Sequence, residues 1–163
     1  MKHSQSGLRK NKMTRRNQAF IFDLDGTIAD CEHRRHFIAT KPKNWPAFFA
    51  GIPHDPVIEW VAATARKTYA IGQKDVVIVT ARHEGCRNDT EAWLQKHGIR
   101  FHAIYFRALK DNRDDTIVKS EILDRVLADG FKPVLVYDDR PKVLRMWNER
   151  GLVTVDCGEG VEF

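Results

Sequence analysis

The sequence predicts an α/β fold in which a mostly parallel five-stranded sheet forms the middle layer of a three-layer sandwich. Short apolar runs alternate with segments of helical periodicity along the 163 residues, a length that suits one domain. The run Val76–Val79 is apolar without interruption, which is typical of a strand buried on both faces. Hydrophobic residues make up 42% and charged residues 30% of the chain, so neither a disordered nor a fibrous protein is indicated.

Five strands and four helices are expected in alternation. The strands are Ala19–Asp23, Asp75–Thr80, Phe101–Phe106, Pro133–Asp138 and Leu152–Asp156. The helices begin at Asp55-Pro56 (Asp as N-cap), at about Asp89, after Asp114-Asp115 and after Arg140-Pro141, and the second and fourth end near Gly98 and Gly151. We expect the apolar residues of these helices to face the core, among them Ile117, Leu127, Trp60, Trp93 and Trp147.

The charge is concentrated at the N-terminus. Six of the 27 basic side chains and no acidic ones lie in residues 1–18, which leaves 21 basic against 22 acidic side chains in residues 19–163. We expect residues 1–18 to form a basic tail, which either attracts nucleic acid or is only a solvated leader, and residues 19–163 to form the domain. No apolar run suits a membrane span or a secretory signal. Three cysteines without a CxxC spacing predict a cytoplasmic protein rather than a disulfide or zinc scaffold.

Polar side chains gather where the expected strands end. Asp23 and Asp25 close the first strand at a spacing that places both on one face, and Asp138-Asp139 close the fourth. Because ligands of such sheets bind beyond the carboxyl ends of the strands, we expect these acids to converge. Converging carboxylates repel each other unless a cation compensates, and Mg²⁺ is the hard divalent ion that suits them best.

This arrangement favours phosphoryl transfer through a carboxylate. A carboxylate beside Mg²⁺ can attack phosphorus to give an aspartyl-phosphate, while a second one exchanges protons with the leaving oxygen and with water. Thr80 offers its hydroxyl and N–H to phosphate oxygens. Lys119 lies near the start of the third helix, where the dipole disfavours a cation unless phosphate or carboxylates face it. The alternative is an i,i+4 pair with Asp115, itself otherwise only an N-cap.

The motifs at the strand ends resemble those of the haloacid dehalogenase (HAD) superfamily. They are Phe22-Asp23-Leu24-Asp25-Gly26-Thr27, Val79-Thr80, Lys119 and Tyr137-Asp138-Asp139-Arg140. With Thr80-Ala81-Arg82, Arg107 twelve residues before Lys119 and Arg34 eleven residues after Asp23, the chain is similar to the 3′-phosphatase domain of phage-type polynucleotide kinase–phosphatases. The resemblance runs from about Phe20 to Phe163, omits the stretch from Cys31 to Pro53 apart from Arg34, and includes no kinase half.

The resemblance implies a HAD-like Rossmannoid fold and a role for each matching residue. Asp23 would be the nucleophile, Asp25 the general acid/base, and Thr80 and Lys119 would hold the phosphate. Mg²⁺ would bind Asp23, Asp138 and the main-chain carbonyl of Asp25, with Asp139 supporting the metal site. The residues expected to shape substrate recognition are Arg34, Arg82, Arg107 and Asp115.

Access to the site depends on residues 31–53, which leave room for a small flap but not for a large cap domain. The segment is basic and aromatic, so Trp45, Phe48 and Phe49 either stack on nucleobases or form a small satellite core. We therefore expect a Mg²⁺-dependent phosphatase of 3′-phosphorylated DNA or RNA ends, with a kinase or ligase that is either a partner on a separate chain or absent. The alternatives are a nucleotide or small-molecule phosphatase and a non-catalytic subunit that binds nucleic-acid ends.

Overall fold

A computed structural model describes residues 18–158. Within this range one sheet contains five strands in the order β3-β2-β1-β4-β5, and every pairing in it is parallel. The strands are β1 (Gln18–Phe22), β2 (Asp75–His83), β3 (Ala103–Arg107), β4 (Lys132–Asp138) and β5 (Val153–Asp156). The predicted α/β architecture is confirmed. The predicted basic tail lies outside the described residues except for Gln18, which begins β1.

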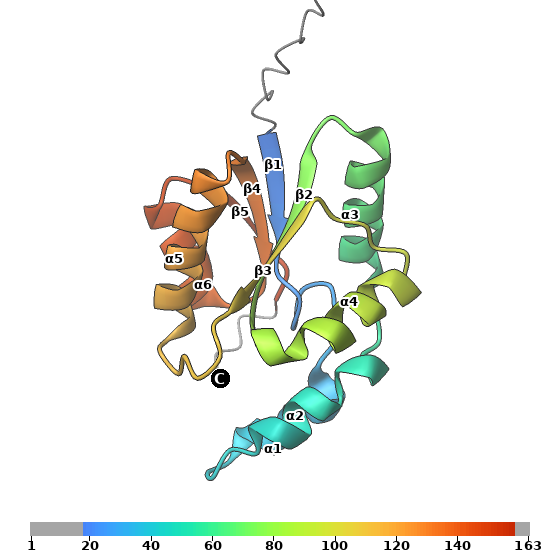
Figure 1. Ribbon diagram of the computed structural model, residues 1–163, viewed down its shortest axis with the longest axis vertical. Coiled ribbons are helices and arrows are strands. Elements are labelled where there is room, and N and C mark those ends of the chain that lie inside the picture. The colour runs from blue at the N-terminus through green and yellow to red at the C-terminus, as the bar shows by residue number, and fades with distance from the viewer. Residues whose placement is uncertain (1–17, 159–163) are drawn as a thin grey trace, which may run out of the picture.

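Helices cover both faces of the sheet (Figure 1). One core lies under α5 (Asp115–Ala128) and α6 (Pro141–Glu149), and the other under α3 (Glu59–Ile71) and α4 (Arg87–Lys96). Alternate residues of β1 enter the two cores, since Ile21 belongs to the first and Phe22 to the second. Three layers result, and β1 lies at their centre.

The predicted start of the first long helix is wrong. The sequence places it at Asp55-Pro56, whereas α3 begins at Glu59, and Asp55 is instead buried among arginines. The buried face of α3 consists of Val61, Ala62 and Ala65. Trp60 lies on the opposite side of the helix and is 51% exposed, so its predicted place in the core is also wrong.

On α5, Ile117 and Leu127 were expected in the core but are 47% and 48% exposed. They lie outside the buried stripe of that helix, which runs through Val118, Ile122 and Val126. The predictions for Trp93 and Trp147 are confirmed, because both are fully buried.

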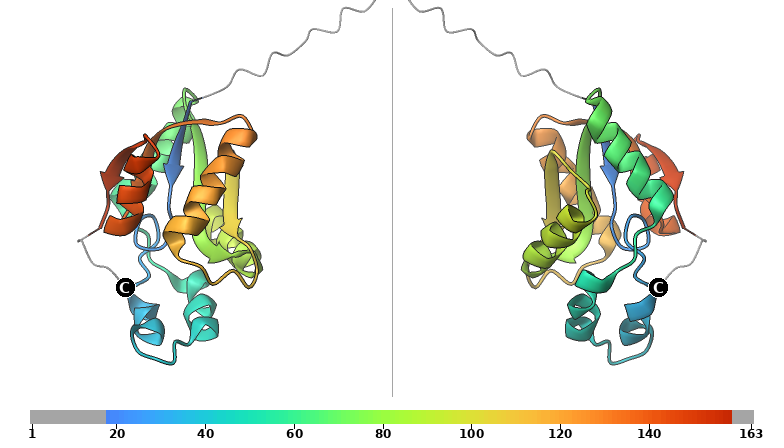
Figure 2. Two further views of the ribbon diagram at one scale, coloured as in Figure 1. Left: turned by 90° about the vertical axis from the view of Figure 1, so that its left-hand side faces the viewer. Right: turned by 90° about the vertical axis from the view of Figure 1, so that its right-hand side faces the viewer.

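Residues 31–53 form a small flap beyond the carboxyl ends of the strands, where α1 (Glu32–Ala39) and α2 (Trp45–Ala50) lie below the sheet in Figures 1 and 2. The short helices η1 (Ile52–His54) and η2 (Glu84–Cys86) complete this end of the molecule. The sequence predicts a flap here but none of its helices. Among residues 18–158, no helix has the length and apolarity that a membrane span requires.

Candidate active site

Three carboxylates meet at the end of the two central strands. Asp23 follows β1 and Asp138 ends β4, and the pairing of Phe22 with Tyr137 brings the two strand ends together. Asp23, Asp138 and Asp139 are all buried, and each has an oxygen within 4.8 Å of an oxygen of the others. The predicted convergence of these acids is therefore a direct consequence of the sheet register.

Lys119 reaches this cluster from α5. Its Nζ lies 3.0 Å from Asp23 Oδ1 and 2.7 Å from Asp138 Oδ2. Burial of the ammonium is outweighed by Asp138 and Asp23, which raise the pKa of Lys119. Of the two alternatives for this lysine, the structure shows the one in which it faces carboxylates.

The charges in this cluster do not balance. If all three buried carboxylates are ionised, they and the one ammonium carry an excess of two negative charges. Burial, aided by Asp138, raises the pKa of Asp139 to about 6, and burial raises the pKa of Asp23 well above its usual value. A divalent cation among the three oxygens would remove this excess, so the donor set fits Mg²⁺.

The surrounding residues fix the orientation of two of the three carboxylates. Trp147 Nε1 donates to Asp138 Oδ2 at 3.2 Å, and Thr27 Oγ1 donates to Asp139 Oδ1 at 3.2 Å. Gly26 has a φ of +84°, and a Cβ at that position would overlap the Asp139 carboxylate. The glycine of the first motif is thus needed both for its turn and for space beside the acid.

Asp25 lies in the same cleft as Asp23 but has different partners. Arg82 Nε donates to Asp25 Oδ2 at 3.1 Å, and Arg34 Nη2 donates to Oδ1. Burial would raise the pKa of Asp25, but the Arg82 and Arg34 guanidiniums outweigh it and lower that pKa. The Asp25 carboxylate is thus outside the three-acid cluster, and only its main-chain carbonyl remains a predicted metal ligand.

Asp55 is the residue at this site that sequence reasoning missed. Its Oδ1 accepts from Arg34 Nε at 2.7 Å, and its Oδ2 accepts from Arg34 Nη2 at 2.7 Å and from Arg82 Nη2 at 3.1 Å. His33 Nε2 lies 2.8 Å from Oδ1. An Asp-Pro pair commonly starts a helix, and no local signal distinguishes such a cap from a buried ion-pair partner. Arg34 and Arg82, predicted to recognise substrate, are here buried between Asp55 and Asp25.

The other two predicted recognition residues form a second group with Arg140. Asp115 is ion-paired with both Arg107 and Arg140. Arg107 also donates from Nε to the carbonyl of Ala81 at 2.9 Å and from Nη1 to the carbonyl of Arg113 at 2.8 Å. Arg107 therefore holds the loop before α5 in place. Arg140 stands in the fourth motif, where the resemblance assigns it no role.

These groups surround a cleft of about 840 Å³. Its lining includes Thr80, whose buried Oγ1 accepts a hydrogen bond from the Arg82 N–H at 3.2 Å. Of the predicted site residues, those on the lining are Asp23, Asp25, Thr80, Arg82, Arg107, Asp115 and Lys119, and the flap contributes Trp45, Phe48 and Phe49. Arg34, Asp138 and Asp139 are buried next to Asp25, Lys119 and Asp23, respectively. The cleft thus brings together residues from all four motifs.

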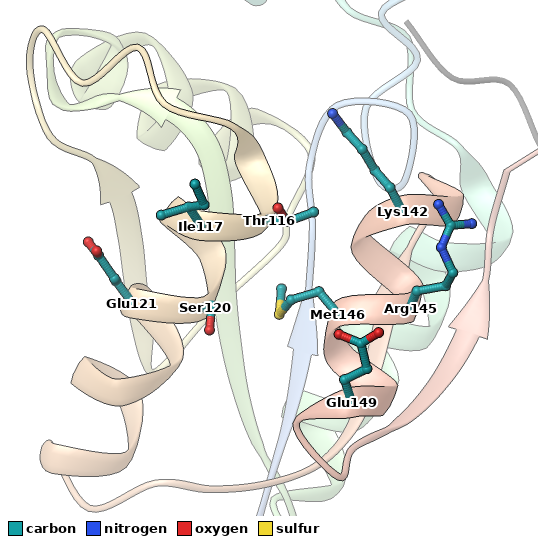
Figure 3. Close-up of a pocket in the computed structure, with 8 residues that line it drawn as sticks. All are labelled: Thr116, Ile117, Ser120, Glu121, Lys142, Arg145, Met146 and Glu149. Carbon is teal, nitrogen blue, oxygen red and sulfur yellow. The ribbon is translucent and has the colours of Figure 1, made fainter.

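A second hollow of about 440 Å³ lies between α5 and α6 (Figure 3). Its lining consists of Thr116, Ile117, Ser120, Glu121, Lys142, Arg145, Met146 and Glu149. It shares only Lys142 with the larger cleft and contains none of the three clustered acids. The larger cleft is therefore the candidate active site.

The family model for the phosphatase domain of polynucleotide kinase PNKP matches residues 17–162. The chain belongs to this family. It is therefore a phosphatase domain of the HAD type, a hydrolase of phosphoric monoesters, and the predicted resemblance is confirmed.

Solved structures support this assignment. A chain of the Pnkp1/Rnl/Hen1 RNA repair complex is 25% identical with a TM-score of 0.75, over 90% of this chain and 44% of that one. A haloacid dehalogenase-like hydrolase from Streptococcus pneumoniae shares the fold, with a TM-score of 0.61 and 14% identity over 86% of this chain and 84% of that one.

A curated relative is a protein of Autographa californica nuclear polyhedrosis virus named as a bifunctional polynucleotide kinase/RNA ligase. It is 24% identical over 149 residues, which are 90% of this chain and 20% of the viral protein. The chain thus spans less than half of the repair-complex protein and a fifth of the viral one.

Proposed function

We propose that this protein is a Mg²⁺-dependent polynucleotide 3′-phosphatase that forms an aspartyl-phosphate on Asp23. The observation that carries the proposal is the cluster of Asp23, Asp138, Asp139 and Lys119, with an excess of two negative charges, beside a basic cleft in a PNKP-type phosphatase domain. The family supports the reaction class, and the cleft supports a polyanionic substrate.

The reaction that we propose has two steps, phosphoryl transfer to Asp23 and hydrolysis of the aspartyl-phosphate. Asp23 attacks phosphorus, the bond from phosphorus to the 3′ oxygen breaks, and Asp25 gives that oxygen a proton. Water then attacks phosphorus and gives a proton to Asp25. The bond from phosphorus to the Asp23 oxygen breaks in this step, so that free Asp23 and inorganic phosphate are the products. Asp23, Asp138, Asp139 and the carbonyl of Asp25 would hold Mg²⁺, which when bound neutralises charge on the phosphate.

Lys119 and Thr80 would bind the transferring phosphate. The Lys119 ammonium lies 3.0 Å from the Asp23 carboxylate, so a phosphate within reach of that nucleophile also meets this positive charge. Thr80 lines the same cleft and is able to donate its hydroxyl.

Asp25 must carry a proton when it meets the leaving oxygen, yet Arg82 and Arg34 lower its pKa in the structure. An incoming phosphate dianion adds negative charge to the cleft and competes for these arginines. Both effects favour protonation of Asp25, so substrate binding would itself prepare the acid.

Phosphate release with Mg²⁺ from three substrates tests the proposal. They are a 3′-phosphorylated oligonucleotide, the same strand phosphorylated at its 5′ end, and free nucleotides, and we expect the first to be preferred. Asp23→Asn should abolish turnover, while Asp89→Asn, a carboxylate that lines the cleft outside the cluster, should retain it. Preference for free nucleotides would instead support a nucleotide phosphatase, and tight binding of ends without release would support a non-catalytic subunit.

We also propose that a kinase or ligase acts beside this domain on a separate chain in the cytoplasm. A chain of the Pnkp1/Rnl/Hen1 RNA repair complex is similar to this one, which supports a partner on a separate chain. The viral relative, whose name combines a polynucleotide kinase with an RNA ligase, supports the two activities but not their separation. Affinity capture of the full chain from its own cells, followed by assays for end phosphorylation and joining, tests this. Capture without either activity would contradict it.

A further inference from the structure

We propose that the flap carries a base-stacking subsite at Trp45, which holds a nucleobase near the 3′ end of a single strand. This inference rests on the proposed function and names the form of its substrate. The lining of the cleft contains aromatic side chains and an excess of basic ones, and a single strand presents bases and phosphates that suit both.

The aromatic wall is a fixed platform. The ring of Trp45 lies 5.7 Å from that of Phe49 with an interplanar angle of 21°, and it meets Phe48 edge-on at 5.8 Å. Phe48 is buried, and Phe49 contacts the ring of His83 in β2 at 4.7 Å, which joins the flap to the sheet. Trp45 lines the cleft and is nevertheless 43% exposed. The predicted satellite core thus holds for Phe48, while Trp45 retains an accessible indole.

The basic side of the cleft supplies charge for a phosphate backbone. The lining has eight lysines and arginines against six aspartates, so it is positive overall although it includes active-site acids. Lys43 places its Nζ over the Trp45 ring, 5.4 Å from the ring centroid, so this side chain would move aside when a base stacks there and would then lie next to that base. Phosphates that flank a base stacked on Trp45 would meet this cation.

The backbone conformation of Lys110, another basic residue of the lining, also points to a ligand. It is exposed at the rim of the cleft and has a φ of +62°, a left-handed conformation that residues other than glycine rarely adopt. Arg107, which precedes Lys110, donates to the carbonyl of Arg113 and pairs with Asp115, and both of these residues follow Lys110. Backbone strain that is held in place this way is typical of ligand sites.

The dimensions favour a strand end over a lone phosphate ester. A cleft of about 840 Å³ lies in the range of sites that enclose ligands of several rings. A base inside a duplex is already stacked on its neighbours, whereas a single strand can offer a free base face. Because every base has such a face, the subsite should show little preference for base identity.

The test measures kcat/KM of the full chain on 3′-phosphorylated single strands that contain one abasic nucleotide at each of the last three positions in turn. When the abasic nucleotide stands at the position that stacks on Trp45, the kcat/KM of wild type should fall roughly 5- to 150-fold, the range for one base–aromatic stack. The kcat/KM of Trp45→Ala on the intact strand should be lower than that of wild type by the same factor, and the abasic substitution should not lower it further. Trp45→Phe should recover most of the lost kcat/KM. Trp60→Ala is the matched control, because Trp60 is an exposed tryptophan outside the cleft.

Two further measurements separate this inference from the proposed function. Release of phosphate from glycerol 2-phosphate, which has no base, should be equal in wild type and Trp45→Ala. If Trp45→Ala instead equals wild type on every strand, the subsite is refuted while the phosphatase assignment stands. If wild type releases phosphate from glycerol 2-phosphate but from no strand, the proposed function fails. Fluorescence anisotropy with a labelled single strand then decides, since weaker binding by Trp45→Ala supports the subsite and equal or absent binding overturns it.

Discussion

Replacing Asp55 with asparagine should destabilise the protein more than any surface charge change. The Asp55 side chain is fully buried, as are those of its partners Arg34 and Arg82. The substitution keeps the size of the side chain but removes its charge. Two buried guanidiniums are then left to share the Asp25 carboxylate, which is itself partly exposed.

The magnitude follows from the contacts. Asp55 accepts three hydrogen bonds from the two arginines, and a buried ion pair that loses one partner typically destabilises by about 3–5 kcal/mol. Because both arginines keep Asp25, we expect a loss near 3 kcal/mol. With a urea m-value of about 2 kcal/mol per M, the unfolding midpoint should fall by about 1.5 M.

Urea unfolding followed by circular dichroism measures this loss, and Asp124→Asn provides the control. Asp124 also pairs with an arginine, at 2.5 Å from Arg150, but its side chain is 66% exposed. An exposed pair contributes about 0–1 kcal/mol, so the control should differ little from wild type. Equal unfolding midpoints for Asp55→Asn and Asp124→Asn would refute the argument that the buried ion pairs of Asp55 stabilise the protein.

Three further outcomes follow from the acid cluster. Gly26→Ala should lose turnover and more stability than Gly72→Ala, because Gly26 is crowded by Asp139 while Gly72, also at positive φ, has open space; urea unfolding and phosphate release compare the two. With a chelator present, the raised pKa of Asp139 means that the folded state binds a proton between about pH 4 and 6 that the unfolded state has released. As the pH rises through that interval, the free energy of unfolding of wild type should therefore fall by about 3 kcal/mol relative to that of Asp139→Asn. Parallel curves of unfolding free energy against pH from pH 4 to 7 would contradict this. At pH 7, Mg²⁺ at about 100 times its Kd should raise the free energy of unfolding of wild type by about 2.7 kcal/mol. A similar increase in Asp138→Asn would show that the ion binds elsewhere.

Most residues that carry chemistry could be predicted because they lie at or near the end of a strand with a clear apolar pattern. Val76–Val79 identifies β2, and Thr80, which follows this run inside the strand, lines the cleft. The same reasoning brings Asp23 and Asp138 together, since neighbouring parallel strands end at one edge. Periodicity and strand ends therefore suffice for the position of the acids.

The flap and its attachment could not be predicted for a different reason. Residues of α1 and α2 bury little, apart from Arg34, Ile38 and Phe48, so no apolar stripe reveals these helices. The burial of Asp55 depends on partners 21 and 27 positions away in the chain. Such contacts become visible only in three dimensions, and Trp60 shows the converse, an apolar residue that the fold leaves at the surface.

The ion pairs that Arg34 of the flap makes with the interior have a consequence for protein engineering. A loop transplanted from another enzyme in place of residues 31–53 would have to supply a guanidinium where Arg34 now lies, between Asp25 and Asp55. Grafts without it would bury an uncompensated anion at the junction, however well their own helices fold. Libraries that diversify the flap should therefore keep this one position fixed and vary the outer face of α2.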